Sequence, residues 1–149
     1  MPNIDDQFRF ARSRVPADPG SAARTRAEFS GWLATHFSLG PERFNDVLLA
    51  VNEAIANAAE FAYADSPQRG TLDVDASYDA QSDTLAVTVD DHGRWRYQVA
   101  RAPGARQELR GRGIPLMQAL ADTLIIDRTP RGTRVTLSWT DVTGRRSAG

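Results

Sequence analysis

Two pairs of short, alternating apolar runs, each joined by a tight turn, constrain the fold more than any other feature. The first pair is TLDVDASY at 71–78 and TLAVTVDD at 84–91, separated by DAQSD. The second is TLIIDRT at 123–129 and TRVTLSW at 133–139, separated by PRG. Alternation at period two predicts strands with one buried face, and turns this short join antiparallel neighbours. The pattern therefore excludes a doubly wound parallel sheet.

Helical patterns occupy the rest of the chain, apart from one further alternating strand at 7–15. The first helix is predicted to begin at Asp18-Pro19 and to end at Gly40, and the second begins near Pro41-Glu42. A third is predicted from 114 to about 121. The order β-α-α-β-β-loop-α-β-β predicts an α+β two-layer sandwich. In it, a mixed, mostly antiparallel sheet is covered on one face by about three helices.

Length and charge limit the kind of protein. The 149 residues suit one domain over 1–149, with a core at about 8–139 and a frayed C-terminal tail from Asp141. The formal charge of -1 gives no overall attraction to nucleic acid or to acidic membranes. There is no signal-peptide pattern and no apolar run of the roughly 18 residues that a membrane span needs. We expect a cytoplasmic protein with no direct nucleic-acid or membrane partner.

The second predicted helix carries a polar pair, Glu53 and Asn57, one turn apart in AVNEAIANAAEFAYAD. At roughly 100° per residue, both side chains point away from the helix's apolar stripe. A solvated back face is the ordinary explanation. Apolar neighbours on the pair's own side, Leu49, Ala50, Ala54 and Phe61, favour a cleft instead. The stripe itself consists of Phe44, Val47, Leu48, Val51, Ile55, Ala58 and Ala62.

Two glycine-containing motifs follow. In DDHGRW, Asp91 ends a strand and can accept a hydrogen bond from a donor such as an exocyclic amine, while Gly93 lets the backbone approach a ligand. In GRGIPLM, Gly111 and Gly113 precede a helix N-terminus, whose free N–H groups suit phosphate oxygens. The alternative for the first motif is a turn that ends the strand, and the alternative for the second is a flexible loop with glycines that bind no ligand. Between them the periodicity is lost, which is typical of a functional or mobile loop.

Three familiar classes of site are excluded. With no cysteine, the chain has no disulfide, thiol nucleophile or cysteine-ligated zinc. With no lysine, it has no G-x-x-x-x-G-K-[ST] phosphate loop. G-R-G-I-P-L also lacks the glycine spacing and the preceding strand of a dinucleotide-binding fold.

The motifs occur in a characteristic order: E-x-x-x-N on a helix, D-x-G after a strand, an irregular span, G-x-G opening a helix, then RGTRVTL. This set resembles the GHKL ATPase superfamily of gyrase, the Hsp90 chaperone, histidine kinases and MutL. The likeness is strongest to its anti-sigma factor serine kinases of the RsbW and SpoIIAB type, in NEAIANAAEFAY, VDDHGRW and GRGIPLMQALAD. The resemblance covers 8–139.

The resemblance implies a nucleotide site. Asn57 would hold the Mg²⁺ that bridges the ATP phosphates, and Glu53 would be the base or orienting group for the attacking hydroxyl. Asp91 would accept from the adenine amino group, with Gly93 allowing the base close. Thr133 would support the adenine-binding end of the site, either through Asp91 or through a water molecule. The lid would span 94–110, and the phosphates would be held by Arg110, Gly111, Arg112, Gly113 and Ile114.

Two positions depart from the resemblance. Trp95 stands at the second glycine of the superfamily's D-x-G-x-G, a replacement that the anti-sigma branch shares. Phe61 stands where that branch usually has histidine. The second difference bears on catalytic rate or partner specificity.

The resemblance also implies a function. The chain would be an ATP-dependent serine/threonine kinase that sequesters a sigma factor and phosphorylates a serine on its STAS-type antagonist, acting as a homodimer. Two alternatives stay open. One is a non-catalytic, nucleotide-gated binding or adaptor module. The other is a regulatory ATPase domain separated from a phosphatase or sensor fusion.

Overall fold

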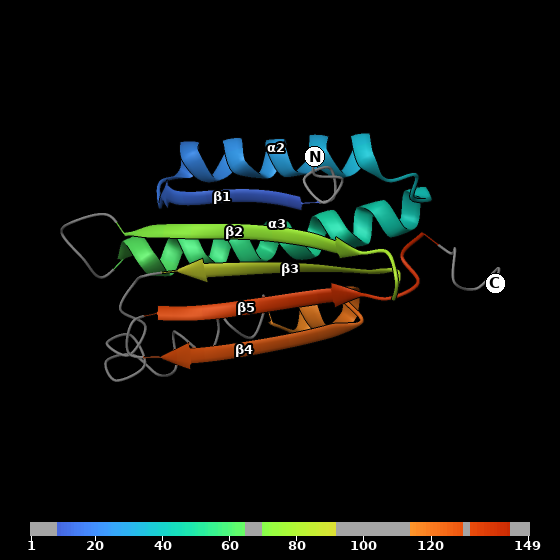
Figure 1. Cartoon of the computed structure of the whole chain (residues 1–149). Helices are drawn as coiled ribbons and strands as arrows, with labels where there is room; N and C mark the ends of the chain where they lie inside the picture. Colours follow the sequence, from blue (N-terminus) through green and yellow to red (C-terminus); the bar gives the residue numbers. More distant parts are fainter. Residues whose placement is uncertain (1–8, 65–69, 92–113, 130–131, 144–149) are drawn as a thin grey trace.

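The structure, a computed structural model, describes residues 9–64, 70–91, 114–129 and 132–143 (Figure 1). Side chains are described in these ranges except at 60–64 and 129. The elements follow the predicted order. They are β1 (Arg9–Pro16), α2 (Pro19–His36), α3 (Pro41–Ala64), β2 (Thr71–Asp79), β3 (Thr84–Asp91), a short helix at 114–120, β4 (Thr123–Thr129) and β5 (Gly132–Trp139).

The strands form one sheet in the order β1-β2-β3-β5-β4. Every described pair is antiparallel, so the mixed component of the prediction is absent from this part of the chain. The two predicted hairpins are confirmed, since Asp79 pairs with Thr84 and Thr129 with Gly132. Gly132 has a φ of 157°, which L side chains rarely adopt, so glycine suits this tight turn.

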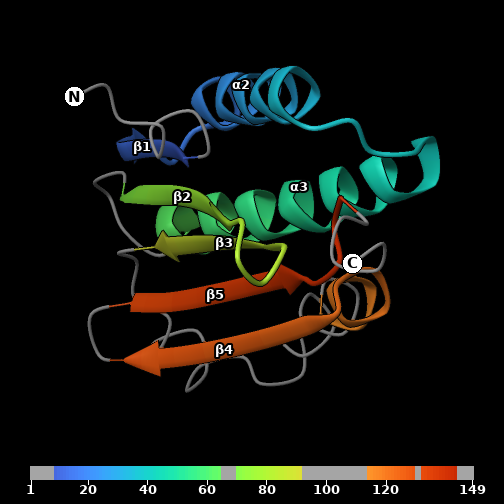
Figure 2. The same cartoon turned by 45° about the vertical axis from the view of Figure 1, so that its right-hand side comes forward.

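All three described helices cover the same face of the sheet (Figures 1 and 2). Helix α2 lies over β1, α3 lies behind β2 and β3, and the helix at 114–120 lies behind β5 and β4. None of these helices is both long and apolar enough to cross a membrane. The core lies between the two layers, and its largest fully buried side chains include Phe29, Leu33, Val47, Ile55, Leu72, Leu85, Met117, Leu137 and Trp139.

Helix α2 shows why sequence and structure differ at one boundary. Its start is as predicted, because the Asp18 side chain caps the helix by accepting from the Ser21 backbone N–H at 2.7 Å. Its end comes earlier than the predicted Gly40, at His36. Phe37 is extended there, and its ring packs edge-on against Tyr78 with centroids 5.1 Å apart. Burial of Phe37 against β2 therefore ends the helix.

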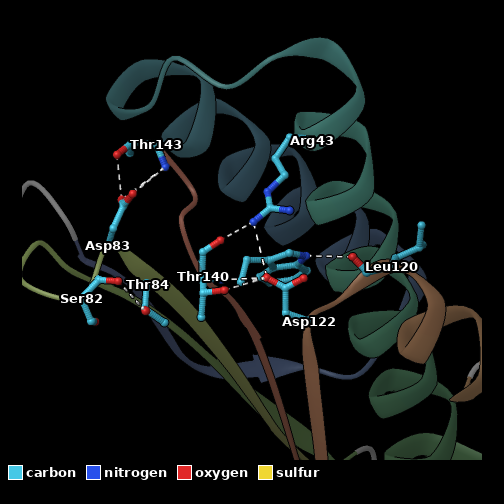
Figure 3. A network of polar contacts seen from close by, with 9 residues as sticks. Arg43, Ser82, Asp83, Thr84, Leu120, Asp122, Thr140 and Thr143 are labelled. Atoms are coloured by element: carbon cyan, nitrogen blue, oxygen red, sulfur yellow. Dashed lines mark hydrogen bonds and ion pairs between the residues drawn. The ribbon is translucent and has the colours of Figure 1, made fainter. Parts of the chain in front are cut away.

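The prediction of a frayed tail is wrong for its first residues, 141–143. Val142 is 5% exposed, and its N–H donates to the Asp83 carbonyl oxygen. The backbone N–H and the hydroxyl of Thr143 both donate to the Asp83 carboxylate, the hydroxyl at 2.7 Å (Figure 3). This segment is held because it supplies donors to a carboxylate that is fully buried in the turn between β2 and β3. Residues 144–149 lie outside the described part.

Replacing Asp83 with alanine is expected to lower the free energy of unfolding by about 2–3 kcal/mol, because the donors it serves are left buried and unpaired. These donors are the Tyr78 hydroxyl and the two Thr143 groups. Urea unfolding followed by circular dichroism measures the change. Ser82→Ala is the matched control, because the Ser82 hydroxyl bonds to Asp79 at the surface of the same turn. An Asp83 variant as stable as the Ser82 control would contradict the assigned role.

Candidate functional site

A narrow pocket opens between α3 and the sheet. Its volume of about 20 Å³ holds roughly one water molecule, so a larger ligand has to displace the side chains around it. Asn57 and Asp91 supply polar groups to a lining that is otherwise apolar. The lining residues are Ala54, Asn57, Ala58, Val89, Asp91, Ile114, Met117, Ile126 and Val135.

Strand register builds one wall of this pocket. Val89 of β3 pairs with Val135 of β5, which pairs in turn with Ile126 of β4, so the three apolar side chains form one row across the sheet. Asp91 pairs with Thr133 in the next described row of the same face. The alternation of β3 and β5 thus places a carboxylate and a hydroxyl at the strand ends, beside an apolar surface.

Helices build the other wall. Ala54, Asn57 and Ala58 stand at positions i, i+3 and i+4 of α3 and therefore share one face. The two alanines are small, which leaves space between the helix and the sheet next to the Asn57 amide. Ile114 and Met117 come from the helix at 114–120, and Ile114 is the first residue of this helix that the structure describes.

Asp91 and Thr133 are the most buried polar residues of the site, 4% and 2% exposed. Within the described residues, the Thr133 hydroxyl oxygen is buried without a hydrogen-bond partner. A buried hydroxyl left unpaired costs about 1–3 kcal/mol, so such a group points to a ligand or a water that completes it. A flat, mainly apolar ring that carries an amino donor fits this set, because Asp91 accepts from the donor and Thr133 bonds to the ring or to a bridging water.

The two consecutive aspartates at the end of β3 face opposite sides of the sheet. Asp90 lies on the face without helices, where it accepts from the Arg134 guanidinium at 2.7 and 3.3 Å. This hydrogen bond, together with the charge of Asp90, raises the pKa of Arg134. Asp91 faces the pocket instead. Because successive side chains of a strand point to opposite faces, Asp90 forms an ion pair on one face and Asp91 lines the pocket on the other.

Glu53 lies one turn before Asn57 on α3, is partly exposed, and is not among the residues that line the pocket. The predicted apolar surround of the pair is wrong in part. Ala50 and Ala54 are almost fully buried in the core, whereas Leu49 is 51% exposed. The reason is that α3 turns Ala50 and Ala54 toward the sheet. Glu53 is thus placed at the solvent side of the site.

Asn57 can offer one amide oxygen to a cation. No group of three or more His, Asp or Glu side chains in the described ranges could hold a metal ion by itself. A Mg²⁺ bound at Asn57 would take its other oxygen ligands from phosphates and water, as this ion commonly does in nucleotide sites. The metal role of Asn57 stays a prediction.

Other predicted site residues lie outside the described part of the chain. These are Gly93, Arg110, Gly111, Arg112 and Gly113, together with the predicted lid at 94–110 and the side chain of Phe61. Among the phosphate-binding candidates, Ile114 is described, and it lines the pocket. Val89, Met117, Ile126 and Val135 were not predicted as pocket residues. Strand pairing would have revealed Val89 and Val135, because they share a face with Asp91 and Thr133.

Two solved structures share the fold of this chain. The crystal structure of the RsbU and RsbW domains of Rv1364c from Mycobacterium tuberculosis matches with a TM-score of 0.66 and 23% identity, over 88% of this chain and 32% of that one. The histidine kinase domain of the EL346 blue-light activated histidine kinase from Erythrobacter litoralis matches with a TM-score of 0.54 and 17% identity, over 89% of this chain and 64% of that one. This chain therefore spans about a third of the first protein and less than two thirds of the second.

The sequence also matches the model of a known protein family. Residues 15–139 match the family described as "Histidine kinase-like ATPase domain". This range includes the three described helices, strands β2 to β5, the last two residues of β1 and every pocket-lining residue. Nucleotide use by this family agrees with a pocket lined by a buried carboxylate, Asp91, whose strand partner Thr133 has an unpaired buried hydroxyl. The chain belongs to the histidine kinase-like ATPase domain family.

Proposed function

We propose that this protein is an ATP-dependent serine/threonine kinase of the anti-sigma factor type. The observation that carries the proposal is a buried carboxylate, Asp91, in an apolar pocket that Asn57 also lines. Thr133, buried as well, stands at the position of β5 that pairs with Asp91. Similarity of fold to a protein with an RsbW domain supports the branch, at 23% identity. In this proposal an adenine amino group donates a hydrogen bond to Asp91, and the ring covers the apolar row of Val89, Val135 and Ile126.

The described residues divide the chemistry between binding and transfer. Asp91 and Thr133 orient the base, and the Asn57 oxygen holds Mg²⁺, which neutralises phosphate charge when bound. Glu53 accepts the proton of the substrate serine hydroxyl. The serine oxygen then forms a bond to the γ-phosphorus of ATP, the bond from that phosphorus to the β–γ bridging oxygen breaks, and ADP leaves. Most of the catalysis is positioning and electrostatics.

The proposed partners follow from the same assignment. One is a sigma factor, held inactive by direct binding. The other is a STAS-type antagonist of the anti-sigma factor, phosphorylated on a serine. We propose that the kinase acts as a homodimer in the cytoplasm, where ATP is available, without binding nucleic acid or membranes itself.

Asp91→Ala is expected to weaken ADP binding at least about a hundredfold, because the loss of a charge-assisted hydrogen bond in a buried site adds to the penalty of the unpaired amino donor. Calorimetric titration of the purified protein with ADP and Mg²⁺ measures this change. Asp90→Ala is the matched control, since Asp90 is the neighbouring residue and bonds to Arg134 on the opposite face. Equal affinity of the two variants would contradict a base-binding role for Asp91.

Repeating the titration with ATP, with and without Mg²⁺, tests the metal site. Asn57→Ala is expected to remove the gain in ATP affinity that Mg²⁺ provides. Wild-type protein that binds no nucleotide at millimolar concentration would overturn the kinase assignment.

Two observations favour the alternative of a non-catalytic binding module. The pocket has room for about one water, and Glu53 stands outside its lining. A module that sequesters its partner needs neither a bound base nor a catalytic carboxylate. The response of phosphate transfer to substitution of Glu53 separates the two functions.

A further inference from the structure

A cluster of polar contacts fastens the C-terminal end of the helix at 114–120 (Figure 3). The Asp122 carboxylate accepts from the Thr140 backbone N–H at 2.8 Å and from the Thr140 hydroxyl at 3.3 Å. The Arg43 guanidinium donates to the Thr140 carbonyl oxygen and lies 3.4 Å from Asp122. The Trp139 indole N–H donates to the Leu120 carbonyl oxygen at 2.9 Å. We call these five residues the helix anchor.

The helix anchor joins three elements that also line the pocket. Arg43 stands in the first turn of α3, Asp122 follows the short helix, and Thr140 follows β5. Asn57 is 14 residues after Arg43 on α3, a distance of about 21 Å at 1.5 Å per residue. Thr133 is seven residues before Thr140, about 23 Å along an extended strand. The helix anchor therefore lies at the end of the domain away from the Asp91–Thr133 pair.

The short helix depends on such contacts for its position. Its seven described residues form fewer than two full turns, and a helical stretch of this length depends on tertiary packing for its stability. On its pocket side it contributes Ile114 and Met117, and Met117 is 1% exposed. Because the pocket holds about one water, entry of a base requires these side chains to shift. The part of the helix that carries Ile114 therefore has to move when a base enters, while the part next to Asp122 is held in place by the helix anchor.

The helix position is stabilised mainly by hydrogen bonds and only weakly by the ion pair between Arg43 and Asp122. The Arg43 and Asp122 side chains are 33% and 40% exposed and 3.4 Å apart, and exposed pairs of this kind contribute little. In contrast, the Asp122 contact to the Thr140 N–H is short, and the Trp139 indole that bonds to Leu120 belongs to a fully buried side chain. Loss of the Asp122 carboxylate removes its two hydrogen bonds from Thr140 and the negative charge that faces Arg43.

We infer that Asp122, supported by Arg43 and Thr140, is a positioning residue for the nucleotide pocket: it holds the helix at 114–120 so that Ile114 and Met117 close on the bound base. The inference rests on the proposed nucleotide-binding function. Apparent affinity falls in proportion to the fraction of molecules with a competent site. A helix that is correctly docked in about a tenth of molecules would raise the ADP dissociation constant about tenfold.

The experiment compares Asp122→Ala with Asp83→Ala in the full chain. Asp83 fastens residues 142–143 to the turn after β2, at the same end of the domain, and is in neither the site nor the helix anchor. ADP and Mg²⁺ are titrated calorimetrically at a temperature where urea unfolding shows each variant folded. We expect Asp122→Ala to weaken ADP binding about tenfold, and Asp83→Ala to bind as wild type despite its lower stability.

Two further readouts separate positioning from general stability. Amide hydrogen exchange in 114–120 is expected to accelerate in Asp122→Ala, to stay near wild type in Asp83→Ala, and to slow again when ADP binds. Asp122→Asn keeps an oxygen that can accept from the Thr140 N–H, so it is expected to restore most of the affinity.

The outcomes of this experiment are distinct. Wild-type ADP affinity in Asp122→Ala, or an equal loss in Asp83→Ala, overturns the positioning role. Wild-type protein that fails to bind ADP overturns the proposed function instead. In that case the helix anchor is tested by hydrogen exchange alone. Unchanged exchange in 114–120 of Asp122→Ala would show that Asp122 does not hold this helix.

Discussion

Glu53→Gln is expected to lower the rate of phosphate transfer to serine by about a hundredfold to ten-thousandfold, the usual contribution of a general base. ADP affinity is expected to stay near wild type, because Glu53 does not line the pocket. Glutamine keeps the size and hydrogen-bonding shape of the side chain but cannot accept a proton. The measurement is single-turnover transfer of labelled phosphate from ATP to a STAS-type antagonist of the same organism.

The control for Glu53 comes from the same helix. Glu42 is exposed in the first turn of α3, and Glu42→Gln is expected to transfer phosphate as wild type does. Transfer that survives Glu53→Gln would remove this residue from the chemistry. Wild-type protein that binds ADP but transfers no phosphate would favour the sequestering module, for which Glu53 has no required task.

Phe29→Ala is expected to reduce the free energy of unfolding by about 3–5 kcal/mol, the range for removing a buried aromatic side chain from a core. Phe29 is fully buried between α2 and the sheet. Its ring lies 5.6 Å from that of Phe10 and 5.8 Å from that of Trp32, so the substitution also removes two aromatic contacts. Because domains are marginally stable by 5–15 kcal/mol, this is a large share of the total.

Urea unfolding followed by circular dichroism measures the change, and Glu28→Ala is the neighbouring control. The Glu28 carboxylate pairs with Arg12 at 2.8 Å on the surface, and such pairs are worth about 0–1 kcal/mol. A Phe29 variant that unfolds at the same urea concentration as the Glu28 variant would show that the cluster of Phe10, Phe29 and Trp32 does not support the fold.

The two ends of the domain have different requirements. At one end, Asp91 and Thr133 are held by strand pairing, which leaves the Thr133 hydroxyl buried without a described partner. At the other end, Asp83 and Asp122 accept several hydrogen bonds each. The unpaired hydroxyl at the first end is available to a ligand, whereas the carboxylates at the second end stabilise the fold through the hydrogen bonds they accept.

Much of the fold and part of the pocket lining were predictable from the sequence. Alternation at period two identified both hairpins and placed Asp91 at the end of a strand. The Asp18-Pro19 signal located the start of α2, since helix caps depend on neighbouring residues. The order of motifs then identified the family, and Asn57, Asp91 and Ile114 do line one pocket.

The tertiary structure decided what depends on residues far apart in the chain. Placing β5 between β3 and β4 aligned Thr133 with Asp91, and burial of Phe37 against Tyr78 ended α2 before Gly40. Thr143, in a tail that was predicted to fray, is held by a hydrogen bond to the buried carboxylate of Asp83. By itself the sequence determined the elements and their buried faces, because both follow from the period of side chains along a short segment. The structure decided which elements meet, because burial and hydrogen-bond satisfaction are shared across the whole chain.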